Sequence, residues 1–96
     1  SNDNKDQILK VLLDAGCDPN AKNRVTGTTI LASLMVMDET PVVLNSIKIV
    51  LEKGGDLNYV MKNKKTIYQT AKAVSNPEVL KVIDNFISDH PEIHVK

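Results

Sequence analysis

Apolar residues recur along the chain at the three- and four-residue spacing of a helix. The first such run covers about residues 6–15 and places Ile8, Leu9, Leu12 and Leu13 on one stripe. Four later segments keep the same spacing, over about residues 29–37, 41–53, 66–74 and 77–89. The pattern therefore predicts an all-α fold of about five helices.

Cap and turn residues separate these segments. Gly16 follows the first run and leads into an Asp-Pro-Asn turn, which is typical of a helix end. Thr40 and Pro41 suit the N-cap and the first turn of the third helix. Ser75 and Glu78 have the spacing of a capping box at the start of the fifth helix. Three of the five predicted helices thus have a physical reason to begin or end where they do.

Two blocks of the chain are repeated. Residues 9–20 align with residues 47–58 at an offset of 38, and both copies end in Gly-x-Asp-x-Asn. A third copy starts at residues 80–83, which is 33 positions further on, and then diverges. Between these copies a second block recurs at residues 27–31 and 64–68. The loop that leads into the first of these two copies is one residue longer than the loop that leads into the second. Periods of this length indicate a repeat protein.

The order of these blocks resembles the ankyrin repeat over about residues 7–88: Gly-x-Thr-x-Leu, a short helix, a turn, a second helix and Gly-x-Asp-x-Asn. The resemblance implies an all-α ankyrin-repeat solenoid, in which helix pairs are joined by long loops, with about two and a half repeats. Helix pairs also build tetratricopeptide and HEAT arrays, but those families join their helices more tightly than the long loops here suggest.

The chain departs from the family pattern at several positions. Ile30 and Ile67 stand where the family usually has proline, and Ala32 and Gln69 stand where it usually has histidine. Lys64 replaces the usual glycine of the second loop. If Lys64 must adopt a positive φ, it costs about 1 kcal/mol more than glycine would. We therefore expect an array of marginal stability.

The repeat pattern also predicts the domain organisation. Residues 1–96 form one ankyrin-repeat domain, divided into a partial repeat at 1–26, a repeat at 27–63, a capping repeat at 64–89 and a tail at 90–96. The first helix has the signature of an outer helix without an inner partner, so the chain looks cut inside a repeat. An open amino-terminal face is then expected, and this face is a candidate for self-association.

The composition argues against several classes of function. Twelve basic and twelve acidic residues give a formal net charge of zero, so no net field attracts nucleic acid. Aromatic residues make up only 3% of the chain, too few for a platform on which bases stack. No apolar run approaches the roughly 20 residues of a membrane span. Nucleic acid is therefore an unlikely partner, and a membrane is not expected as one.

Few residues of this chain are candidates for catalysis or metal binding. Cys17 is the only cysteine, so it forms no intramolecular disulfide, and we expect a buried thiol that acts as a small apolar residue. His90 and His94 have the i, i+4 spacing of metal ligands, but Pro91 between them opposes one continuous helix. We expect a solvated tail there. The sequence predicts no enzyme, no catalytic or metal site and no cofactor.

Two surfaces are candidates for binding a partner protein. The long loops are expected to be neighbouring fingers with a basic ridge suited to an acidic surface, formed by Lys22, Asn23, Arg24, Lys62, Asn63, Lys64 and Lys65. The inner helices are expected to line the family's concave groove with Ala32, Ser33, Val36, Gln69, Thr70, Lys72 and Ala73. By resemblance, then, we expect a non-catalytic protein–protein interaction module.

Two alternatives stay open. The chain could be an accessory or targeting domain of a larger multidomain enzyme or of a secreted bacterial effector. The basic fingers could also bind nucleic acid directly, and the affinity would then fall steeply with salt. We expect a cytoplasmic protein, or one secreted into a host cytoplasm if it belongs to an effector.

Overall fold

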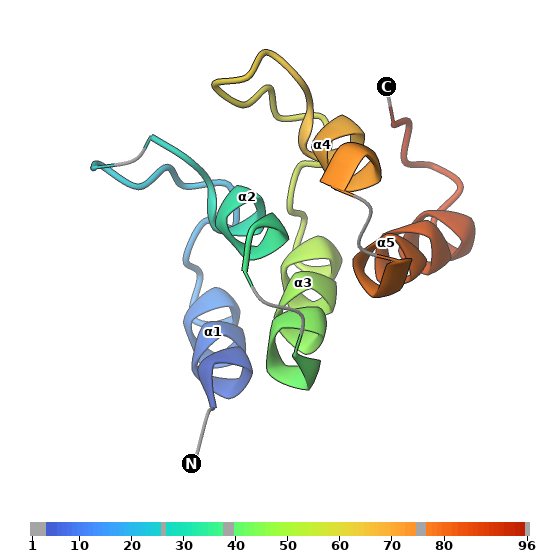
Figure 1. Cartoon of the computed structure of the whole chain (residues 1–96). Coiled ribbons are helices and arrows are strands. Elements are labelled where there is room, and N and C mark those ends of the chain that lie inside the picture. The colour runs from blue at the N-terminus through green and yellow to red at the C-terminus, as the bar shows by residue number, and fades with distance from the viewer. Residues whose placement is uncertain (1–3, 26, 38–39, 75–76, 96) are drawn as a thin grey trace.

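A computed structural model describes residues 4–25, 27–37, 40–74 and 77–95. Within these ranges the chain forms five α-helices (Figure 1): α1 Lys5–Asp14, α2 Ile30–Met35, α3 Pro41–Glu52, α4 Ile67–Val74 and α5 Pro77–Asp89. The same ranges contain no β-strand, only two isolated antiparallel bridges. The prediction of an all-α fold is confirmed.

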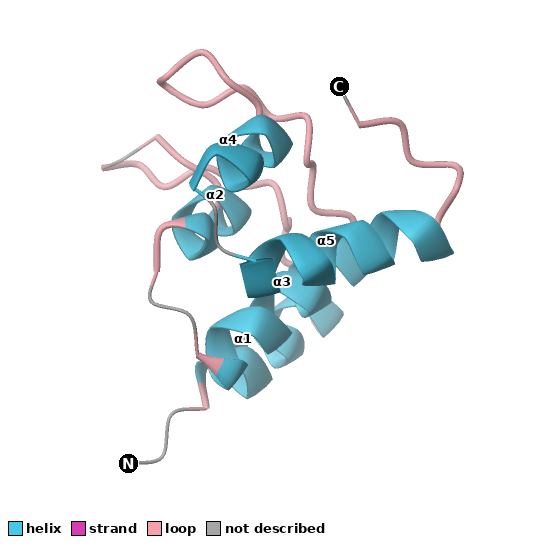
Figure 2. Cartoon of the chain, turned by 45° about the vertical axis from the view of Figure 1, so that its right-hand side comes forward, coloured by secondary structure: helices cyan, strands magenta, loops and turns pink. Residues whose placement is uncertain are grey.

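The helices form two rows. In the first row α3 lies between α1 and α5 and contacts both of them. The shorter α2 and α4 contact each other in the second row, which lies above the first row in Figures 1 and 2. Each short helix also packs against the long helix that follows it in sequence. The chain thus alternates between the rows, and the loops that precede α2 and α4 leave the body on the same side.

The predicted helix ends are right to within one or two residues. Thr29 and Thr40 are N-caps, and their side-chain oxygens accept the N–H groups of Ala32 and Val43, each at 3.2 Å. Helix α2 ends at Met35 rather than at the predicted Met37. The predicted cap at Ser75 lies outside the described residues.

The glycines that end α1 and α3 do so in the same way. Gly16 and Gly54 have φ values of 103° and 99°, a region that glycine enters without a steric penalty. In α1 the Cys17 N–H donates to the Leu12 carbonyl at 3.1 Å. In α3 the Gly55 N–H donates to the carbonyl of the equivalent residue at 2.8 Å. This is the Schellman closure, and its recurrence shows that the sequence repeat is also a repeat of structure.

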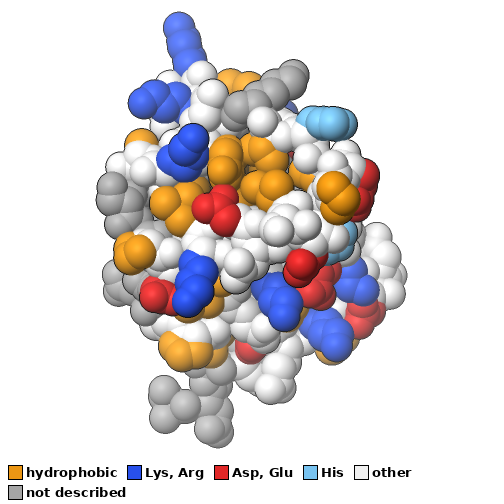
Figure 3. Space-filling view, turned by 90° about the vertical axis from the view of Figure 1, so that its right-hand side faces the viewer, with side chains coloured by type: hydrophobic (Ala, Val, Ile, Leu, Met, Phe, Trp, Pro, Cys, Tyr) orange, Lys and Arg blue, Asp and Glu red, His pale blue; other side chains and the backbone are white. Residues whose placement is uncertain are grey.

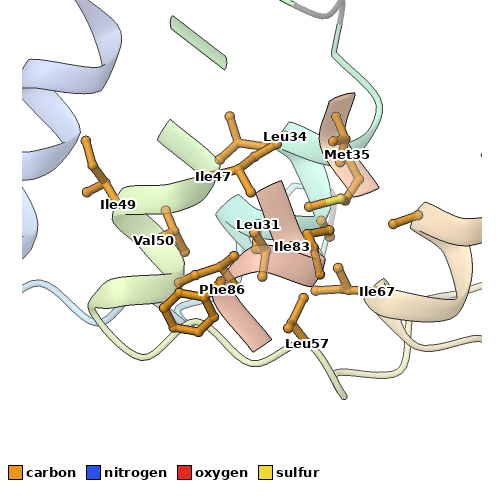
Figure 4. Close-up of a cluster of buried hydrophobic side chains, with 14 of the residues drawn as sticks. Leu31, Leu34, Met35, Ile47, Ile49, Val50, Leu57, Ile67, Ile83 and Phe86 are labelled. Atoms are coloured by element: carbon orange, nitrogen blue, oxygen red, sulfur yellow. The ribbon is translucent and has the colours of Figure 1, made fainter. Parts of the chain in front are cut away.

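One apolar core fills the space between the rows (Figure 4). Its most buried large side chains come from α2, α3, α4 and α5: Leu31, Ile47, Val50, Ile67 and Ile83. Burying one such side chain stabilises the fold by roughly 1.5–3 kcal/mol. Each of these four helices therefore contributes directly to the stability of the core.

Helix α1 contributes less to this core than its sequence predicts. Of the expected stripe only Leu13 is buried, and Leu9 is half-buried. Ile8 and Leu12 are 52% and 48% exposed. Helix α1 contacts α3 on one side, while its opposite side faces outward.

Candidate protein-binding surface

The two long connections fold back on themselves as finger loops, which we call finger one (residues 20–28) and finger two (residues 58–65). In finger one the Asn23 N–H donates to the Thr28 carbonyl at 2.8 Å. In finger two the Met61 N–H donates to the Lys65 carbonyl at 2.8 Å. The two fingers thus form the same kind of turn, and the turn is one residue shorter in finger two.

The turn of each finger passes through a residue with positive φ. Finger one has Gly27 at φ 70°, and finger two has Lys64 at φ 66°. Among the described residues, Lys64 is the one non-glycine residue in this region. Lys64 therefore does adopt the positive φ that the sequence analysis considered as a condition. A lysine there costs on the order of 1 kcal/mol, because its Cβ crowds the backbone.

Tyr59 joins the two fingers. Its hydroxyl donates to the carbonyl of Gly27 at 3.0 Å, and the ammonium group of Lys22 lies 5.4 Å from the centre of its ring. Gly27 also approaches finger two closely, since a Cβ added there would lie 3.7 Å from Cε of Lys62. The fingers are therefore neighbours, as Figure 1 shows. Tyr59 was not predicted from the sequence, although a lone aromatic residue in a polar loop is a usable signal.

The predicted basic residues of the fingers are all exposed: Lys22, Arg24, Lys62, Lys64 and Lys65. Neither finger contains an acidic residue. Lys and Arg side chains stand at the upper end of the molecule in Figure 3, at the height of the finger loops in Figure 1. We call these five side chains and the exposed Val25 between them the finger surface. Val25 is 91% exposed, and it adds an apolar contact that the sequence analysis did not include.

The two predicted asparagines have a structural role within the fingers. The side-chain oxygen of Asn23 accepts the Val25 N–H at 2.7 Å, and that of Asn63 accepts the Lys65 N–H at 2.9 Å. The amide group of Asn63 also donates to the hydroxyl of Thr70 at 3.3 Å, which ties finger two to α4. Both asparagines are exposed, and these bonds hold the loops in shape.

Two of the predicted inner-helix contacts are wrong. Ala32 and Thr70 are only 2% and 7% exposed, so they belong to the interior. Ala32 sits in α2, which packs against both α3 and α4, and Thr70 sits under the amide of Asn63. Small side chains at these positions let neighbouring elements approach one another, which leaves no room for a partner.

The remaining predicted inner-helix residues are accessible. Ser33 is half-buried beside finger one and lies 3.4 Å from the hydroxyl of Thr28. Val36, Gln69, Lys72 and Ala73 are exposed. A hollow of about 250 Å³ opens between finger one and α2, lined by Ala21, Lys22, Asn23, Thr28, Ile30 and Ser33. Of the predicted inner-helix residues, Ser33 therefore lines a hollow that finger one also lines.

Gln69 has a second role as a helix cap. Its side-chain oxygen accepts the Thr66 N–H at 3.0 Å, and the Thr66 hydroxyl accepts the Gln69 N–H at 3.1 Å. This reciprocal pair is a capping box at the start of α4. The glutamine that departs from the family pattern thus stabilises the helix end next to finger two.

Lys72 and Tyr68 form a polar cluster between α4 and α5. The ammonium group of Lys72 lies 5.2 Å from the centre of the Tyr68 ring, and the Tyr68 hydroxyl donates to the carboxylate of Asp84 at 3.0 Å. Partial burial, and then the bond to Asp84, raise the pKa of Tyr68. The hydroxyl therefore stays protonated at neutral pH and keeps its bond to α5.

The expectation of a buried Cys17 is wrong, because its side chain is exposed in the turn that follows Gly16.

The expectation of a solvated tail holds only in part. Pro91, Glu92 and His94 are exposed, but the ring of His90 stacks on Phe86 at 4.1 Å, and Ile93 is half-buried against the core. The carbonyl of His94 accepts a bond from Asn58 at 2.6 Å. Over the ranges that the structure describes, no three metal-ligating side chains come together.

Comparison of this chain with protein-family models, with curated proteins and with solved structures finds no match. Among the described helices, none has both the length and the apolar character that crossing a bilayer requires. Function is therefore inferred from the geometry of the fingers and helices.

Proposed function

We propose that this chain is a non-catalytic, ankyrin-type repeat module that binds a partner protein through the finger surface. The observation that carries the proposal is the pairing of two fingers that hold five cations and no carboxylate in a chain of zero net charge. A local excess of positive charge on adjacent loops favours a partner with an acidic surface.

The arrangement of the helices supports the ankyrin-type part of this proposal. Long helices α1, α3 and α5 lie in one row, short helices α2 and α4 lie in the other, and the fingers project from the same side. The turns after α1 and α3 close with the same glycine geometry. An array of this kind presents loops and short helices together to one ligand.

The partner surface is expected to combine carboxylates with an apolar contact. Arg24 and Lys62 supply exposed cations on separate fingers, while Val25 offers apolar area beside them. The hollow next to Ser33 is large enough for one side chain of the partner. Charged pairs at the rim of such an interface raise the association rate more than they raise the affinity.

A matched pair of charge reversals tests the proposal. The variant Arg24→Glu with Lys62→Glu changes one cation on each finger and leaves both the strained Lys64 and the Lys22–Tyr59 contact intact. The control Lys48→Glu with Lys81→Glu makes the same charge change on exposed positions of α3 and α5. Both variants and the native chain are used to capture proteins from nuclease-treated lysate of the parent cell, after circular dichroism has confirmed equal folding.

The proposal expects one protein that the native chain and the control both retain and that the finger variant loses. Nuclease treatment ensures that no nucleic acid bridges the chain and the captured protein. If all three chains capture the same proteins, the finger surface is not the binding site. The same capture from untreated lysate is run in parallel, and a ligand that appears there but in no nuclease-treated sample would instead favour the nucleic-acid alternative.

A further inference from the structure

Positive and negative charges are separated along this chain. Residues 20–37 and 58–74, which contain the fingers and the short helices α2 and α4, hold six of the twelve basic residues and none of the twelve acidic ones. Their formal charge is therefore +6, and that of the rest of the chain is −6. The contact between α2 and α4 and the bond from Tyr59 to Gly27 bring the two segments together. They form one basic half with a positive potential.

The hollow of about 250 Å³ beside finger one lies within this basic half. Lys22 supplies a positive charge to its lining, and the hydroxyls of Thr28 and Ser33, which also line it, lie 3.4 Å apart. Ala21 and Ile30 add apolar area. A hydroxyl rotates about its C–O bond, so Ser33 can donate either to Thr28 or to a ligand. This lining matches a side chain that has methylene groups and ends in an anion.

Lys22 is held at this hollow by its backbone and by its side chain. Its backbone pairs with that of Thr29 in an isolated antiparallel bridge. Thr29 is only 2% exposed and is the N-cap of α2, so the bridge is anchored in the interior. The Lys22 ammonium group lies 5.4 Å from the centre of the Tyr59 ring. A cation restrained in this way loses less conformational entropy when it binds an anion.

The larger hollow between α3 and α5 does not offer the same charge. Its volume is about 450 Å³, and Glu52 and Asp89 line it as well as Lys48. An anion brought into that hollow would meet two like charges. Charge complementarity therefore favours the hollow beside finger one as the place where an acidic side chain binds.

We propose that the hollow beside finger one binds a glutamate side chain from an acidic segment of the partner protein. The Lys22 ammonium group pairs with the carboxylate, and the Ser33 hydroxyl donates a hydrogen bond to it. The methylene groups of the glutamate lie against Ala21 and Ile30. One lysine balances one carboxylate, but it does not balance the charge of about −1.5 to −2 of a phosphorylated side chain. This inference rests on the proposed function, because it requires a partner that contacts the finger surface.

An NMR titration of the labelled chain with a capped peptide of alternating Glu and Gly tests the proposal. We expect the peptide to shift the amide signals of residues 21–23 and 28–33, and we expect this binding to weaken as salt is added. The same peptide with Gln in place of Glu should leave these signals unchanged. A Glu peptide that shifts none of them, or a Gln peptide that shifts them equally, would overturn the proposal.

Substitutions in the hollow test the named contacts. Lys22→Gln should raise the dissociation constant of the Glu peptide by about tenfold, and Ser33→Ala should raise it by about threefold. Lys65→Gln is the matched control, because it removes an exposed cation from the same basic half but lies on finger two. It should raise the constant by less than about twofold. Equal weakening by Lys22→Gln and Lys65→Gln would show diffuse attraction to the basic half and would overturn the proposal.

The lysate capture separates this inference from the proposed function. If the variant Arg24→Glu with Lys62→Glu loses the partner while Lys22→Gln with Ser33→Ala retains it, the finger surface binds the partner and the proposed glutamate contact is wrong. If the first variant retains the partner while the Glu peptide still binds in the hollow, the proposed function fails and the hollow remains a glutamate site.

A nucleic-acid probe tests the competing ligand class. A single-stranded oligothymidylate, titrated under the same conditions, should shift the amide signals of residues 21–23 and 28–33 less than the Glu peptide does. Larger shifts with the oligothymidylate would overturn the proposal, because they would assign the basic half to phosphate groups rather than to carboxylates.

Discussion

Asn20 binds the backbone of Asp56, the third residue of the Gly-x-Asp-x-Asn turn in the next repeat. The side-chain oxygen of Asn20 accepts the Asp56 N–H at 2.7 Å, and its amide group donates to the carbonyl of Gly54 at 3.0 Å. Asn58 occupies the equivalent position one repeat later and donates to the carbonyl of His94 at 2.6 Å. The tail thus accepts the hydrogen bond that the turn of a further repeat would accept. The two asparagines therefore connect successive units of the chain.

Asn20→Ala should lower the free energy of unfolding by about 1 kcal/mol, because it removes two hydrogen bonds to the neighbouring turn. The exposure of Asn20 keeps the loss at this level, since water can replace the missing partner. Urea unfolding followed by circular dichroism measures the change. Asn85→Ala, at an exposed position of α5, is the control. Equal unfolding midpoints for the two variants would show that the asparagine contributes nothing to the coupling between turns.

Lys64→Gly should stabilise the chain by roughly 0.5–1 kcal/mol. The substitution removes the steric cost of a positive φ. Glycine also has greater conformational freedom in the unfolded chain, and this offsets part of the gain. Lys62→Gly, two residues earlier in the same finger, has no such strain to relieve and should destabilise instead. The difference between the two thermal midpoints is the measurement, and a loss of stability in Lys64→Gly would contradict the strained geometry.

The helices and their caps could be predicted from the sequence because they depend on local chemistry. Thr40 with Pro41 starts a helix in most contexts, and Gly16 ends one. The burial of individual helix faces could not be predicted in the same way. Ile8 and Leu13 lie on the same predicted stripe, yet only Leu13 is buried, because burial depends on which neighbour each face meets.

Gln69→Ala should destabilise the chain by about 0.5–1.5 kcal/mol, because the Thr66 N–H loses its acceptor at the start of α4. Gln69→Glu should recover that stability, since a carboxylate at the third helical position accepts the same bond and interacts favourably with the helix dipole. Urea unfolding of both variants decides the point. Equal losses in the alanine and glutamate variants would argue against the capping box.

Lys53→Met should raise the pKa of Asp14 towards the ordinary value of an aspartate. The hydrogen bond from the Lys53 ammonium group, and then its charge, hold the pKa of this carboxyl low, with a smaller contribution from Lys10. Because the folded pKa is depressed, the pair contributes stability above the ordinary pKa of an aspartate. This contribution is lost as the pH falls through the lower folded value. Both groups are partly exposed, so the effect on stability is small.

Carbon-detected NMR titration of the Asp14 carboxyl group measures this pKa in both chains. Lys48→Met provides the control, since Lys48 is an exposed lysine of α3, the helix that Lys53 caps, and its removal should leave the titration of Asp14 unchanged. An unaltered Asp14 titration in Lys53→Met would mean that the ion pair does not persist in solution.

The candidate site could be predicted only in part. The exposure of the basic finger residues could be predicted from the sequence, because long polar loops between helices project from the body of a protein. The contact that joins the fingers was not, since the bond from Tyr59 to the Gly27 carbonyl depends on how two loops lie in space. Ala32 and Thr70 were misplaced for the same reason: their small side chains suit both a groove and a close helix contact, and the structure uses them for the latter.

The adjacency of the two fingers is the arrangement on which the proposed binding surface depends, and paramagnetic relaxation tests it most directly. A nitroxide label on Arg24→Cys, in a Cys17→Ser background, reports which backbone amides lie near finger one. We expect strong broadening of the amide signals of residues 61–65 and little effect on residues 84–88 in α5. Unbroadened signals across residues 61–65 would contradict the paired fingers and, with them, the proposed binding surface.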